Sequence, residues 1–139
     1  MIFVSPEEHG DVIEVLSLED PAKPRVLLRP QLPKGLGHYK IYNCPNYMPD
    51  GKSILFLAAS GGRHGFDYDV YQLDLESGAV ERLTKGNGYA TNLKVFADGK
   101  RVVFLKWSSD WHGTPVKSEL NLLDLESREV SSFPVSGLN

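Results

Sequence analysis

The sequence repeats itself at a spacing of about fifty residues, and this repeat limits the possible fold more than any other feature. Asp50–Lys52 recurs as Asp98–Lys100, a shift of 48 residues (98 − 50). Asp74–Ser77 recurs as Asp124–Ser127, a shift of 50 (124 − 74). The two extra residues fall in one connection between these landmarks, as expected for a repeat with fixed strands and tolerant loops. The chain is therefore built from one structural unit that is repeated.

Each repeat is predicted to be a four-stranded antiparallel sheet. Pro49–Lys52 reads as a tight turn, because Pro presets φ, Asp bonds back to the backbone and Gly accepts a positive φ. This turn joins a first strand, 41–47, to a second, 53–59, as a hairpin. A third strand over 69–76 alternates apolar and polar residues, and a short fourth strand covers 80–83.

The second strand of each repeat is apolar at successive positions, as in Ile54–Ala59 and Val102–Leu105. That pattern is typical of a strand covered on both faces. No stretch of ten or more residues has apolar residues at the helical spacing, so no substantial helix is expected. Arg128 stands where the earlier repeat has Gly78, and we therefore expect a different turn there.

An incomplete third repeat opens the chain. Ile2–Val4, Asp11–Leu18 and Val26–Leu28 match the second, third and fourth strands, and the first strand and its Asp-Gly turn are missing. The chain is thus predicted to hold eleven strands in one domain. Its expected parts are an incomplete unit at 1–29 and complete units at 38–85 and 90–134.

The stretch Tyr47–Thr84 resembles the propeller repeat of the TolB family, which also occurs in the propeller domains of prolyl oligopeptidases. The shared pattern is aromatic-x-Pro-Asp-Gly-Lys, an apolar strand, Asp-x-Tyr-x-Leu-Asp-Leu-x-x-Gly and a Leu-Thr ending. The later copy departs from it at Ala97, Asn121 and Ser132-Phe133. The resemblance implies an all-β fold of four-stranded β-propeller blades, about two and three-quarter blades of a partial propeller. It also implies binding through the loop-rich face or the axial mouth.

Fewer than three whole blades pose a physical problem. Closed propellers have about 4 to 8 blades, and an open stack leaves apolar end faces that mark association sites. Three solutions stay open: two chains that close a ring with C2 symmetry, a fragment of a longer propeller, or an open wedge covered by other copies. We expect a homo-oligomer unless the chain is a fragment. In a two-chain ring, the last blade of each chain meets the first of the other.

A His-Gly pair occurs in the connection between the second and third strands of every repeat. The histidines are His9, His64 and His112, and His38 lies in a connection between repeats. Propeller topology gathers these connections on one rim, so the histidines are candidates for partner or ligand binding. His64 and His112 are also weak candidates for a divalent metal site, since imidazole is a common metal ligand. The alternative is that they are solvated loop residues; no cofactor is expected.

Aromatic residues are enriched in the same connections. Phe66 and Trp111 lie in mid-loop and are candidates for a protein-binding or sugar-stacking surface. Tyr68 and Trp107 are expected to end their strands and to pack between sheets. Cys44 is expected to be a small buried residue within a strand.

Composition restricts the function further. The 139 residues carry a formal charge of −3, which gives no basic footprint for nucleic acid. No apolar stretch approaches a membrane span of roughly 18 residues, and the first residues lack the pattern of a signal peptide. A cytoplasmic location is the default, and a periplasmic one stays open if the chain is a mature form.

We expect a non-enzymatic protein-interaction scaffold. No counterpart of the TolB α/β domain is seen, so that family's envelope role and partner are not carried over. The enzymatic alternative is a metal-dependent carbohydrate lyase, since some oligogalacturonate lyases resemble propellers of this type with metal-binding histidines. A piece of a larger propeller is the third interpretation.

Overall fold

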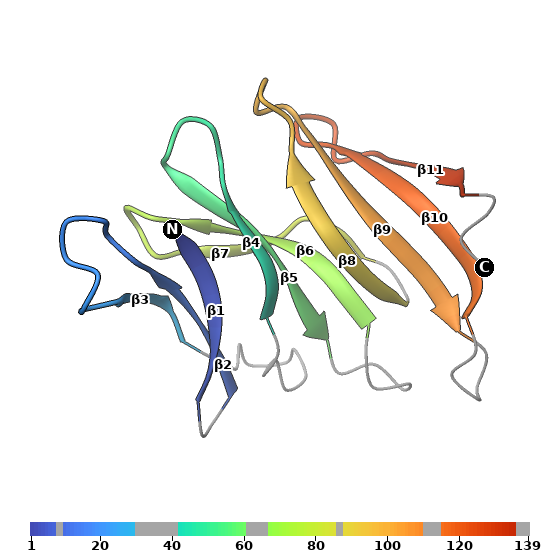
Figure 1. Cartoon of the computed structure of the whole chain (residues 1–139). Helices are drawn as coiled ribbons and strands as arrows, with labels where there is room; N and C mark the ends of the chain where they lie inside the picture. Colours follow the sequence, from blue (N-terminus) through green and yellow to red (C-terminus); the bar gives the residue numbers. More distant parts are fainter. Residues whose placement is uncertain (8–9, 30–41, 61–66, 86–87, 110–114, 136–139) are drawn as a thin grey trace.

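A computed structural model of the chain contains strands and turns and no helix in the part that it describes, and so no helix that could cross a membrane. The residues described are 1–7, 10–29, 42–60, 67–85, 88–109 and 115–135. Within these ranges, eleven strands form three antiparallel sheets that stand side by side in chain order (Figure 1). The prediction of an all-β fold of four-stranded blades, preceded by an incomplete one, is confirmed.

We call the three units the first, middle and last sheets. The first sheet contains β1 (Ile2–Glu7), β2 (Gly10–Val15) and β3 (Arg25–Leu28). The middle sheet contains β4 (Tyr42–Tyr47), β5 (Ser53–Ser60), β6 (Asp67–Asp74) and β7 (Val80–Arg82). The last sheet contains β8 (Tyr89–Val95), β9 (Arg101–Ser109), β10 (Pro115–Asp124) and β11 (Val130–Pro134). Neighbours in sequence are neighbours in every sheet, as in a meander of hairpins.

The Asp-Gly hairpins have the same geometry in both complete sheets. Gly51 has φ +69° and Gly99 has φ +67°, in the left-handed region that favours glycine. In each turn the Asp side chain accepts a hydrogen bond of 2.9 Å from the backbone N–H two residues later, at Asp50 and at Asp98. The loss of Pro at Ala97 therefore leaves the turn intact, because Asp and Gly are enough to hold it.

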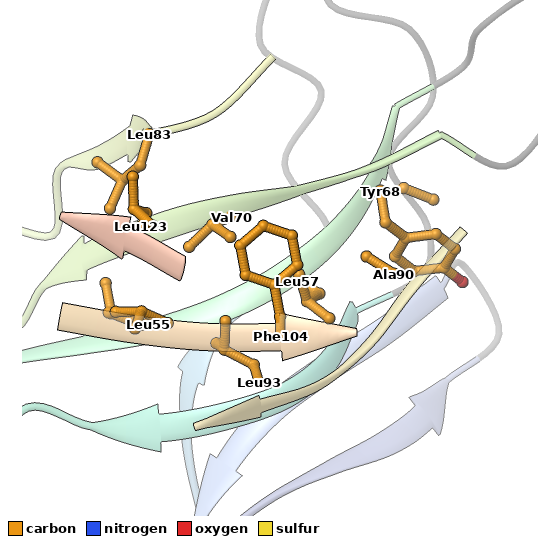
Figure 2. Packing of buried hydrophobic residues seen from close by; sticks show 11 residues of the cluster. Leu55, Leu57, Tyr68, Val70, Leu83, Ala90, Leu93, Phe104 and Leu123 are labelled. Atoms are coloured by element: carbon orange, nitrogen blue, oxygen red, sulfur yellow. The ribbon is translucent and has the colours of Figure 1, made fainter. Parts of the chain in front are cut away.

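The continuous apolar run of β5 is buried on both faces, as predicted. Ile54 and Phe56 pack toward the first sheet, and Leu55 and Leu57 pack toward the last. Two cores result, one on each side of the middle sheet. Figure 2 shows the core between the middle and last sheets, where side chains from both sheets meet.

The innermost strands β4 and β8 both contain a β-bulge at the same place in the repeat. The left-handed residues are Cys44, with φ +50°, and Asn92, with φ +56°, 48 positions later (92 − 44). Asn tolerates this conformation better than Cys does. Cys44 lies within a strand, as expected, but it is half-buried against the core between the middle and last sheets rather than buried.

The expectation of a different turn at Arg128 was wrong. Gly78 has φ +73° and Arg128 has φ +65°, and each donates its backbone N–H to the carbonyl oxygen four residues earlier at 2.9 Å. The side chains of Asp74 and Asp124 hold both turns by accepting hydrogen bonds from the backbone N–H groups two and three residues later. These bonds fix the backbone, and Arg128 adopts the strained conformation that results.

Candidate functional site

The last sheet has one covered face and one uncovered face. Val102 and Phe104 of β9 are buried in the core against the middle sheet. Val103 and Leu105 alternate with them, point to the opposite face and are only half-buried. Beyond this face no further sheet stands in the described part of the chain (Figure 1). Its apolar side chains therefore meet solvent.

The repeat supplies an internal control for this face. Leu57, Val70 and Leu83 of the middle sheet point toward the last sheet and are buried. The 48- and 50-residue shifts place Leu105, Leu120 and Phe133 at the equivalent positions. Leu120 is 38% exposed and Phe133 is 51% exposed. The same face of the same unit is thus covered in one copy and open in the next.

The open side chains form one continuous patch. Leu120 of β10 lies in cross-strand register with Leu105 on one side and Phe133 on the other, and the next pair on this face is Leu122 with Val103. Cross-strand partners on one face have Cβ atoms about 5 Å apart, so these side chains touch. We call this patch the uncovered face; its residues are Val103, Leu105, Trp107, Leu120, Leu122 and Phe133.

An aromatic row links the inter-sheet core to the edge of the uncovered face. Tyr68 is buried between the middle and last sheets, as expected, and its ring centroid lies 5.0 Å from that of Tyr89. Burial raises the pKa of Tyr68 above its ordinary value, and the nearby Tyr89 adds to this effect. Trp107 stacks on Tyr89 at 4.6 Å, within the last sheet rather than between sheets.

A buried carboxylate ties the outer strands of the middle sheet together. Asp69 is 2% exposed; its carboxylate pairs with Arg82 and accepts a 3.0 Å hydrogen bond from the Thr84 hydroxyl. Burial raises the pKa of Asp69, and this effect outweighs the lowering by Arg82 and Thr84. In the last sheet a neutral hydrogen bond of 2.7 Å, from Ser132 to Asn121, joins the corresponding strands. We interpret Asp69 as a structural residue.

The binding residues predicted from sequence lie outside the described residues and stay predictions: His9, His38, His64, Phe66, Trp111 and His112. Within the ranges that the structure does describe, no three His, Cys, Asp or Glu side chains come together to hold a metal ion. The sequence predicted that an open stack has apolar end faces suited to association, but it did not name the residues of the uncovered face. Mapping Leu57, Val70 and Leu83 forward by the repeat shift would have located it.

No protein-family model matches the chain, and a search of curated proteins found no match. Among solved structures, TolB from Acinetobacter baumannii superposes with a TM-score of 0.74 at 20% identity, over 99% of this chain. The fold is that of a TolB-like β-propeller. A putative TolB from Agrobacterium tumefaciens gives a TM-score of 0.73 at 19% identity, over 97% of this chain. The β-propeller domain of the trilobed protease from Pyrococcus furiosus gives 0.60 at 16%, over 99%.

The TolB-like resemblance predicted from the sequence is thereby confirmed for the fold. The chain spans less than half the length of each of these structures: 30% of the Acinetobacter protein, 45% of the Agrobacterium protein and 39% of the Pyrococcus domain. Those structures therefore contain more than the three sheets described here.

Proposed function

We propose that this chain is a non-enzymatic protein-interaction module of the TolB-like propeller type, and that it binds another protein through the uncovered face. The observation that supports this proposal is the internal control: Leu120 and Phe133 are exposed at positions whose counterparts, Val70 and Leu83, are buried by a neighbouring sheet. The equivalent face of the middle sheet is buried by a neighbouring sheet. The uncovered face is therefore the part of the chain best suited to association.

The energetics favour covering this face. Full burial of a Leu or Phe side chain contributes about 1.5–3 kcal/mol, and several such side chains are adjacent here. Contiguous apolar patches on a monomer mark interaction sites more often than scattered apolar residues do. Leu18 is a useful contrast, because it is 89% exposed in the connection between β2 and β3, away from the patch.

Site-specific photo-cross-linking tests the proposal. A photoreactive phenylalanine analogue is placed at Leu120 in one variant and at Leu18 in a control, and each is irradiated in cells. We expect the probe at position 120 to give defined protein adducts that the probe at position 18 does not give. Adducts from position 120 should disappear when Phe133 is also replaced by Lys. The absence of any adduct specific to position 120 would refute the proposal.

A further inference from the structure

We draw no further inference here: the strongest candidate, the apolar patch around Leu120 and Phe133 on the uncovered face of the last sheet, carries none beyond the proposed function, because nothing in the described part of the chain shows what covers it.

Discussion

The middle and last sheets come from the same repeat but differ in what covers them. β5 and β9 have nearly the same apolar pattern, yet every residue from Ile54 to Leu57 is buried, whereas Val103 and Leu105 are half-exposed to solvent. The difference lies in the neighbours. The middle sheet stands between two sheets, and the last sheet has one in the described part of the chain. A continuously apolar strand is fully buried only where a sheet packs on each of its faces. Among the described sheets this holds for β5 and not for β9.

The two sheets also differ in how their third and fourth strands are joined. The middle sheet uses the buried Asp69 with Arg82 and Thr84, and the last sheet uses the neutral pair of Asn121 and Ser132. Two of the departures of the later repeat from the family pattern, Asn121 and Ser132, thus fall on the hydrogen bond that joins these strands. We call the group of Asp69, Arg82 and Thr84 the charged clamp. The last sheet keeps its hairpin turns but has a neutral hydrogen bond in place of this clamp.

The largest expected effect tests whether the uncovered face is open in the folded monomer. In a Phe133→Lys background, chosen to weaken any association through the uncovered face, we expect Leu57→Ala to lower the free energy of unfolding by about 3 kcal/mol, because it leaves a cavity in the core. The equivalent Leu105→Ala should cost less than about 1 kcal/mol, because solvent already reaches this side chain. Urea unfolding measures both. Equal costs would show that Leu105 is covered within one chain and would contradict the proposed difference between the two sheets.

The charged clamp should be the next most sensitive point. Asp69→Ala leaves the partly buried Arg82 without its carboxylate, and we expect a loss of about 3 kcal/mol in the free energy of unfolding. Asn121→Ala removes a neutral hydrogen bond and should cost about 1 kcal/mol. Chemical denaturation of both variants measures the two losses in the free energy of unfolding. A smaller loss for Asp69→Ala than for Asn121→Ala would show that the desolvation of Asp69 cancels the benefit of its pairing.

Much of this architecture could be predicted from the sequence, and the limits have physical causes. The hairpins at Gly51 and Gly99 follow from local turn chemistry, and the burial of Ile54–Leu57 follows from the apolar run. The exposure of Leu105 could not be read locally, because β9 carries the same signal as β5. The turn at Arg128 was missed because hydrogen bonds from the backbone to Asp124 outweigh the preference for glycine. The loop residues proposed as sites lie outside the described residues.

The equivalent turns at Gly78 and Arg128 offer a smaller test. Because Arg128 has φ +65°, Arg128→Gly should relieve strain and raise the free energy of unfolding by about 0.5–1 kcal/mol, after allowing for the greater freedom of Gly in the unfolded chain. Gly78→Arg should lower it by about 1 kcal/mol for the same reason. The ion pair from Arg128 to Glu81 is exposed and contributes little. Thermal unfolding of the two variants should show opposite shifts; shifts of the same sign would contradict the shared geometry.

The smallest expected effect concerns acid, where the two sheets should behave alike. Hydrogen bonds from Ser77 lower the pKa of Asp74, and those from Ser127 lower the pKa of Asp124, both from an ordinary value of 3.8. A carboxyl group whose pKa is lower in the folded chain stabilises it above the unfolded pKa, and this contribution is lost as pH falls through the folded pKa. Asp74→Asn and Asp124→Asn should therefore each flatten the decline in stability below about pH 3.8, and by similar amounts.

Urea midpoints between about pH 2 and 6, measured for the parent chain and for both variants, resolve this effect. Each Asn keeps the side-chain oxygen that accepts the turn hydrogen bonds, so the fold is retained while the titrating group is removed. Asp50→Asn, in the neighbouring hairpin, serves as a matched turn variant that also keeps the acceptor. Similar effects for Asp74 and Asp124 would show that the shared turns behave as one unit in both sheets, so that the difference between the sheets lies in what covers them. A clear inequality would place part of that difference inside the repeat itself.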